Sequence, residues 1–287
     1  VAGSGLRSFA LAVLFLFGLT CVRPGRLEAA PVTKAATGTD LTLSSSWSGG
    51  VLPGVLDVAL FDATLTGGTS FLLSGSLSLA GVQLTNPGGP VSLATETYTL
   101  SLGAEGLDLA SARQDLTLTG LLNLSAAQTW SVSQGRTLNV LSSVGGGTSA
   151  GLWKSGRGTA VLSGSNTYTG QTAVTGGVLL VTNGSALGTG ASPVLVGGDS
   201  LIGGGALILA GPGGTGFTLA QNLTLSGYGS SSTPAAQGSG MVLAQAALLS
   251  VGNNTLTGSV TTSSASVTRI HSAAGQLTLA GQLNLGA

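Results

Sequence analysis

The sequence predicts an all-β fold in which short strands stack, turn upon turn, into a parallel β-helix. Triplets of an apolar, a small polar and an apolar residue recur along the chain, which is the period-two pattern of a strand with one buried face. Whole phrases also return, since DLTLTGLLNL at 115–124 comes back as QLTLAGQLNL at 276–285. Such repetition favours a solenoid over a β-sandwich.

Each predicted strand is one of these triplets, bounded by glycine, serine or asparagine residues that form turns. The triplets lie at 41–43, 77–79, 100–102, 107–109, 116–118, 122–124, 138–140, 179–181, 223–225, 277–279 and 283–285. Beyond the N-terminal region, no segment keeps helical periodicity for ten or more residues. At about 20 to 25 residues a coil, we expect about 11 or 12 coils and a rod of about 50 to 60 Å.

The composition suits such a stack and excludes one class of partner. Charged residues make up 6% of the 287 residues, and 49 residues are glycine. In a ladder of stacked coils, like charges would stand only about 5 Å apart, which is unfavourable, whereas Leu, Val, Thr, Ser and Asn stack without penalty. The nine basic and nine acidic residues cancel and form no basic cluster beyond the N-terminus, so no nucleic acid partner is expected.

The N-terminal residues 1–29 have the pattern of a signal peptide. Arg7 precedes an apolar run at 9–22, and a polar stretch with small residues follows. Leu27 and Ala29 occupy the minus-three and minus-one positions, so we expect cleavage between Ala29 and Ala30. An uncleaved anchor or an N-terminal core strand is the alternative interpretation of the run.

The single cysteine, Cys21, lies inside this apolar run. It fits a lipoprotein acceptor poorly, because Gly18 stands three places before it, where leucine is expected. Cleavage would leave a mature chain with no cysteine and hence no disulfide. Repetition and packing must then supply the stability of the mature chain.

Residues 151–190, GLWKSGRGTAVLSGSNTYTGQTAVTGGVLLVTNGSALGTG, resemble the autotransporter-associated beta strand repeat, also called the passenger-associated transport repeat. The residues that fall on its pattern are Leu152, Lys154, Gly156, Gly158, Thr159, Leu162, Ser163, Gly164, Asn166, Tyr168, Gly170, Thr172, Val174, Gly177 and Leu179. Ala160 stands where leucine is usual. The resemblance implies a right-handed parallel β-helix in a bacterial surface or secreted passenger, where the repeat is thought to aid export.

The flanking segments resemble other parts of the same family. Residues 217–230 and 253–284 are similar to the spacer between consecutive repeats, and residues 46–62 are similar to the start of such mature regions. We therefore expect four parts: the signal peptide at 1–29, N-terminal coils at 30–150, the repeat at 151–190 and spacer coils of a truncated chain at 191–287.

Within the repeat, small residues are expected to serve geometry. We expect six glycines to take positive-φ corner positions; they are Gly156, Gly158, Gly164, Gly170, Gly176 and Gly177. Tyr168 is expected to pack beside a turn capped by Asn166, with a sugar-stacking platform as the alternative.

Candidate catalytic groups are few, and we predict no enzyme, no cofactor and no metal. Arg113 and Arg136 lie about one coil apart and are expected on one face near Asp115. A lyase-like or hydrolase-like site is the alternative to solvated corner charges for the acids, which are Asp57, Asp62, Glu96, Glu105, Asp108 and Asp115. His271 is the sole histidine, so a histidine-based metal site is not available. The glycine-rich stretches at 146–151 and 202–214 are turns and not phosphate cradles.

The function predicted from these observations is that of an exported, non-catalytic stalk or adhesin-like passenger, secreted or at the cell surface. Its expected partners are the export machinery, an outer-membrane translocator absent from this chain, and surface glycans or a host or matrix surface. The alternative is a carbohydrate-binding or polysaccharide-cleaving β-helix, in which acids and aromatics would converge on one face. A third interpretation is an envelope or matrix protein that self-associates end to end through uncapped coils.

Overall fold

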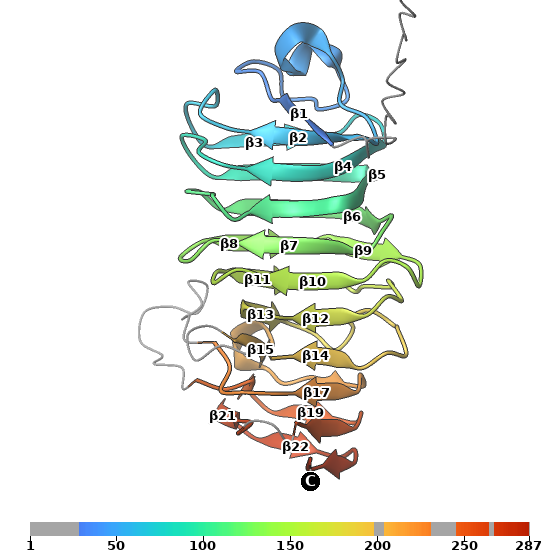
Figure 1. Ribbon diagram of the computed structural model, residues 1–287, viewed down its shortest axis with the longest axis vertical. Helices are drawn as coiled ribbons and strands as arrows, with labels where there is room; N and C mark the ends of the chain where they lie inside the picture. The colour runs from blue at the N-terminus through green and yellow to red at the C-terminus, as the bar shows by residue number, and fades with distance from the viewer. Residues whose placement is uncertain (1–28, 198–203, 231–244, 264–266, 287) are drawn as a thin grey trace, which may run out of the picture.

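The computed structural model describes residues 29–197, 204–230, 245–263 and 267–286 and shows an all-β parallel solenoid of about ten turns. The turns stack along one axis, with the N-terminal residues at one end of the rod and the C-terminal residues at the other (Figure 1). Among the described residues, every pairing between named strands is parallel. The predicted stack of short strands is therefore confirmed.

Most of the strands are short, and β5 is the exception with 19 residues. They are β1 (Ala30–Thr33), β2 (Asp57–Phe61), β3 (Thr69–Leu72), β4 (Leu77–Leu84), β5 (Val91–Leu109), β6 (Leu116–Leu124), β7 (Gln128–Val132), β8 (Thr137–Val140), β9 (Ser143–Gly146), β10 (Leu152–Ser155), β11 (Thr159–Leu162), β12 (Thr172–Val174), β13 (Gly177–Val181), β14 (Val194–Val196), β15 (Gly205–Ala210), β16 (Thr218–Leu219), β17 (Leu223–Leu225), β18 (Leu248–Val251), β19 (Asn254–Leu256), β20 (Val260–Thr262), β21 (Ile270–Ala274), β22 (Leu277–Leu279) and β23 (Leu283–Asn284). Three short 3-10 turns accompany them, η1 (Ser44–Ser46), η2 (Ser48–Gly50) and η3 (Pro212–Gly214).

Parallel pairing places the same position of successive turns in one ladder. One interior ladder runs through Val32, Ala59, Val82, Leu107, Trp130, Lys154, Val174, Val196 and Leu225. The alternate positions of the same strands face outward and carry mostly small or polar side chains, such as Ser131 and Thr224. Because the side-chain period of a strand is two, the triplets put their apolar ends into the core and their polar centre outside.

The main apolar core runs the length of the rod, from Leu41 to Val260. A second buried cluster lies on the opposite face of four strands, β11, β13, β15 and β18. Its members include Val178 and Leu180, which alternate with Leu179 and Val181 of the main core. Strands that are buried on both faces read as continuous apolar runs, which accounts for GVLLV at 177–181.

Aromatic rings close the N-terminal end of the core. The ring of Phe61 lies 6.2 Å from that of Trp47 and 5.4 Å from that of Phe71. Lys34 is buried above them, with its Nζ 4.9 Å from the centre of the Phe71 ring and donating to the carbonyls of Ala35 and Thr37 at 2.8 and 2.7 Å. The end of the rod is thus sealed by large side chains and one satisfied ammonium group.

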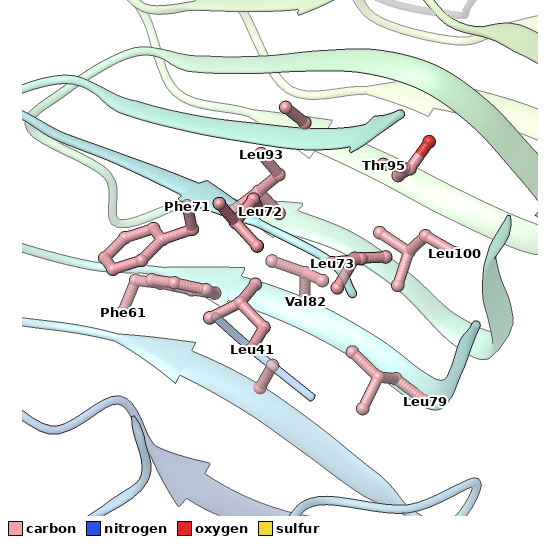
Figure 2. Close-up of a pocket in the computed structure, with 12 residues that line it drawn as sticks. Leu41, Phe61, Phe71, Leu72, Leu73, Leu79, Val82, Leu93, Thr95 and Leu100 are labelled. Carbon is pink, nitrogen blue, oxygen red and sulfur yellow. The ribbon is translucent and has the colours of Figure 1, made fainter. Parts of the chain in front are cut away.

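An internal cavity of about 10 Å³ lies beneath this aromatic cluster. Figure 2 shows its lining side chains, among them Leu41, Phe61, Phe71 and Val82, directed toward one another, with Thr95 at one side. A cavity this small with an apolar lining offers a water molecule almost no polar partners. It is a packing void of the core.

Two expectations about the strands were wrong in detail. Residues 41–43 form a turn, because the Asp40 carboxylate accepts from the amide and hydroxyl of Thr42 at 2.9 and 2.6 Å, and this local bonding replaces strand pairing. The turns number about ten, fewer than the expected 11 or 12. Leu152 pairs with Thr172, 20 residues later, but Leu207 pairs with Leu248, 41 residues later. Some turns in the C-terminal part therefore contain more residues than expected.

Candidate functional site

The repeat-like segment forms one turn of the solenoid and the beginning of the next. Its first two strands, β10 and β11, stack directly on β12 and β13, with Leu152 opposite Thr172 and Thr159 opposite Val178. Thr159 and Thr172 are both buried at the starts of their strands. The side chains of this segment therefore act mainly between neighbouring turns.

Lys154 is fully buried inside the rod, in the ladder between Trp130 and Val174. Its Nζ donates to the carbonyls of Ser155, Gly156 and Gly176 at 2.6, 3.0 and 3.1 Å. Burial away from water lowers the pKa of Lys154 to about 7. This lysine thus ties the corner after β10 to the corner of the next turn.

Asn166 joins three successive turns from a buried position between β11 and β12. Its Oδ1 accepts from the amide of Val144 in the preceding turn at 2.8 Å, and its Nδ2 donates to the carbonyl of Ala186 in the following turn at 2.6 Å. Its own amide donates to the carbonyl of Ser185 at 3.0 Å. The side chain thus satisfies two buried backbone groups, the amide of Val144 and the carbonyl of Ala186.

Tyr168 is also fully buried, and its hydroxyl lies 2.7 Å from the Thr172 hydroxyl. Burial raises the pKa of Tyr168 to about 12, although the hydrogen bond with Thr172 acts in the opposite direction. A ring with no exposed face cannot stack on a sugar. The position of Tyr168 therefore matches the packing interpretation and leaves no room for a sugar-stacking platform.

Replacing Tyr168 with phenylalanine is expected to lower the free energy of unfolding by about 1 kcal/mol, because the Thr172 hydroxyl then loses its buried partner. Denaturant unfolding of Y168F, T172V and the double variant measures this directly. In the double variant, the loss should be smaller than the sum of the two single losses, since neither hydroxyl is left unpaired. Strictly additive losses would contradict this hydrogen bond.

The glycines of the repeat divide into two kinds, and the expectation that all take corner conformations was wrong. Gly156 and Gly177 have positive φ, at 71° and 64°. Gly158, Gly164 and Gly170 do not, but a Cβ at each would overlap backbone atoms of the preceding turn, and Gly176 is also outside the positive-φ set. Gly158, Gly164 and Gly170 are therefore required for close approach of backbones between turns.

The charged residues near the middle of the rod lie as the spacing predicts but form only a surface pair. Arg136 Nη1 donates to the Arg113 carbonyl at 3.0 Å and lies 3.9 Å from Asp115 Oδ1. Both side chains of the ion pair are more than one third exposed. An exposed pair of this kind contributes at most about 1 kcal/mol of stability.

Three of the other acids accept hydrogen bonds from backbone amides two or three residues away. Asp57 Oδ2 accepts from the Gly54 amide at 2.8 Å, Asp62 Oδ1 from the Thr64 amide at 2.9 Å, and Asp108 Oδ1 from the Ala110 amide at 2.9 Å. Glu96 is exposed and has a φ of 51°. These carboxylates cap turns at separate places on the rod.

One surface hollow of about 210 Å³ lies along β1, β2, β4 and β5. Two carboxylates, Glu105 and Asp108, and the amide of Gln83 line it together with Ala29, Pro31, Val58 and Val82. Gln83 Nε2 already donates to Asp108 Oδ2 at 2.9 Å. The lining contains no aromatic ring, so the hollow lacks the stacking surface that sugar sites commonly use.

No described part of the chain brings together three or more His, Cys, Asp or Glu side chains in a way that could hold a metal ion. His271 lies exposed on β21. Among the same residues, no helix has the length and apolar character needed to cross a bilayer.

The expected cleavage position lies where the described structure begins. Ala30 starts β1 and pairs with Asp57 of β2, and Ala29 directly precedes it. The remainder of the predicted signal peptide, including Arg7, Cys21 and Leu27, lies outside the described residues.

Sequence reasoning missed the sealed N-terminal end. Aromatic residues make up only 4% of the chain, yet three of them, Trp47, Phe61 and Phe71, lie close together in the sequence and in space. This local concentration could have indicated an aromatic cluster. The burial of Lys34 was not foreseeable from its neighbours APVT and AATG. Its carbonyl acceptors, Ala35 and Thr37, are local, but the Phe71 ring that it faces belongs to β3.

Comparison with known proteins supports the repeat. A family model described as Passenger-associated-transport-repeat matches residues 152–181, which lie within the segment singled out from the sequence. No match was found among curated proteins or among solved structures. This repeat is typical of autotransporter passengers. Residues 152–181 are therefore a passenger-associated transport repeat, built into a β-solenoid of about ten turns.

Proposed function

We propose that this chain is an exported, non-catalytic passenger whose role is to extend and to present a surface, as a stalk or an adhesin-like rod. The observation that carries the proposal is the use of the repeat residues. Lys154 and Asn166 are buried and hydrogen-bonded between turns, and Tyr168 is buried and hydrogen-bonded to Thr172 within one corner. The polar groups of these residues therefore hydrogen-bond within the solenoid, as expected of residues that hold a structural repeat together.

The proposed location is the cell surface or the medium, reached through the signal peptide predicted at residues 1–29. The presence of a repeat typical of autotransporter passengers supports export. The proposed partners are the export machinery and an outer-membrane translocator, with surface glycans or a host or matrix surface as what the rod meets outside.

A carbohydrate-binding or polysaccharide-cleaving function is the alternative. Its acids would have to come from the hollow that contains Glu105 and Asp108. Both the bond of Asp108 with Gln83 and the absence of an aromatic ring in the lining weigh against this alternative.

Processing of the N-terminus tests the proposal. The chain carrying a C-terminal epitope tag is expressed in a bacterium with an outer membrane, the cells are fractionated, and the N-terminus of the exported product is sequenced. We expect a product that begins at Ala30 and lies outside the cytoplasm. Ala29→Arg is the matched control, because signal peptidases need a small residue at minus one and this position precedes β1.

The Ala29→Arg variant should accumulate with its N-terminus intact. If the unaltered chain stays in the cytoplasm at full length, the proposed export is wrong.

A further inference from the structure

Three arginines stack at one corner of the solenoid in successive turns. Arg113 lies between β5 and β6, Arg136 between β7 and β8, and Arg157 between β10 and β11. These connections lie above one another, because β5, β7 and β10 pair in succession and so do β6, β8 and β11. The Arg136 carbonyl also accepts from the Thr159 amide of the following turn at 3.0 Å. We call these three residues the arginine corner.

The arginine corner holds most of the positive charge that reaches the surface. Arg113 and Arg157 are exposed, and Arg136 is 36% exposed. Over the described ranges, Lys34 and Lys154 are buried, so the remaining cation at the surface is Arg269. Stacked turns lie about 4.8 Å apart, a distance at which like charges repel one another. Gathering three cations at one corner therefore favours a role in binding anions over a role in stability.

The acids of the chain lie mainly outside this corner. Every acidic residue except Asp199 lies at or before Asp115, so the sequence from 116 to 198 contains no carboxylate side chain. The three connections that carry the arginines contain one carboxylate, Asp115, which lies 3.9 Å from Arg136 and accepts from the Thr137 amide at 2.9 Å. Positive charge thus predominates at this corner, although the formal net charge of the whole chain is zero.

An exposed tryptophan flanks the arginine corner. Trp153 lies on β10, within the face where β7, β10 and β12 are stacked (Figure 1), and it is 37% exposed. It pairs with Thr129 of the preceding turn and Ala173 of the following turn, which both have small side chains. Trp153 precedes Arg157 by four residues, a span of at most about 14 Å. An indole at this distance can stack on a ring of the same ligand that meets the arginines.

Charge density separates the classes of anionic polymer that could meet this corner. One arginine per turn supplies one positive charge per about 4.8 Å of rod. Double-stranded DNA carries one negative charge per about 1.7 Å, which is much denser. A polymer of uronic acids carries one carboxylate per sugar ring, which is closer to the spacing of the turns. Guanidinium groups bind carboxylates through paired hydrogen bonds, and the sugar rings offer apolar faces to an indole.

We propose that the arginine corner and Trp153 bind an acidic polysaccharide built of uronic acids. Its carboxylates meet the arginines of successive turns, and one of its rings lies against the indole. The inference rests on the proposed passenger function and deepens it, because it names the class of surface glycan that the rod meets. The hollow that contains Glu105 and Asp108 is a separate site and takes no part in this binding.

Tryptophan fluorescence of the full chain tests the proposal with polygalacturonate as the probe. The chain has three tryptophans, and Trp47 and Trp130 are buried, so a bound sugar changes the emission mainly through Trp153. We expect a saturable change in emission, protection of Trp153 from acrylamide quenching, and an affinity that falls as salt is added. Fully methyl-esterified polygalacturonate is the matched control ligand, because it keeps the sugar backbone without its charge. It should produce neither change.

Arg136→Gln and Arg269→Gln form a matched pair of variants, since each removes one cation from the surface. Arg269 lies outside the corner, with its guanidinium carbon 4.7 Å from the centre of the Tyr228 ring. We expect R136Q to weaken polygalacturonate binding about threefold and R113Q/R136Q/R157Q about tenfold or more, while R269Q keeps the affinity of the unaltered chain. Circular dichroism checks that each variant keeps its β structure.

Equal binding of the methyl ester overturns the proposal, and so do equal affinities of R136Q and R269Q. Dextran sulfate and single-stranded DNA are added as further probes, and tighter binding of either one than of polygalacturonate contradicts the uronic acid assignment. Binding is measured on purified protein, so it is independent of export. A chain that is exported and processed at Ala30 but does not bind refutes this inference alone, whereas a chain that binds but stays in the cytoplasm refutes the passenger function alone.

Discussion

Replacing Asn166 with alanine is expected to lower the free energy of unfolding by about 3 kcal/mol. The substitution leaves the amide of Val144 and the carbonyl of Ala186 without their partners, and both lie in the buried corner between turns. Each buried backbone group left unpaired costs about 1 to 3 kcal/mol. Denaturant unfolding followed by circular dichroism measures the loss.

Asn123→Ala is the matched control for this prediction. Asn123 is half-buried, and its Nδ2 makes only long contacts, 3.5 Å to Ser101 Oγ and 3.3 Å to Ser125 Oγ. The same substitution there should lower stability by less than about 1 kcal/mol. If N166A and N123A lose similar amounts, Asn166 does not link the three turns in solution.

The stability of the wild-type protein is expected to rise with pH above neutrality because of Lys154. The folded pKa of Lys154 is about 7, below the model-compound value of 10.5 that applies to the unfolded chain. Between these values the unfolded chain binds one more proton than the folded chain, so the free energy of unfolding increases by about 1.4 kcal/mol per pH unit. Below pH 7, the buried charged form of Lys154 destabilises the folded state by its full amount. This destabilisation decreases as the pH rises and Lys154 loses its proton in the folded state.

Lys154→Met isolates this contribution, since methionine keeps an unbranched apolar chain but cannot titrate. The stability difference between wild type and K154M should shift in favour of wild type by about 3 kcal/mol from pH 6.5 to pH 9.5. Burial also lowers the pKa of Lys34, but Lys34 is present in both proteins and cancels. The raised pKa of Tyr168, about 12, affects stability only above this window. Parallel pH profiles for the two proteins would contradict the assignment.

Local patterns predicted most of the strands, and the exception shows their limit. The triplet at 223–225 became β17 with both leucines buried, as the period-two pattern requires. The triplet at 41–43 has the same letters, but the Asp40 side chain competes for its backbone. Burial opposes the charged form of Asp40, yet hydrogen bonds from Ser74 and Thr42 hold its pKa at about 2. Ser74 belongs to the next turn, which no local window includes.

For the residues of the repeat, the sequence also identified the residues but not their partners. The repeat pattern singled out Asn166 and Tyr168, yet their partners Val144, Ala186 and Thr172 are defined by stacking and by the fold of one corner. For the glycines, composition could not distinguish positive φ from close backbone approach, because both need the same residue. Backbone atoms of the preceding turn lie close to both Gly156 and Gly164, and the positive φ of Gly156 is what separates the two.

The sequence by itself determined that this protein is an all-β stack containing a passenger-associated transport repeat, because the period of two and the recurring phrases are written in neighbouring residues. Only the tertiary structure decided which residues of different turns meet. The span between paired strand positions ranges from 19 residues at Thr159 to 41 at Leu207, and no local pattern specifies it. That span places Lys154 between Trp130 and Val174, where burial away from water sets its pKa and its role.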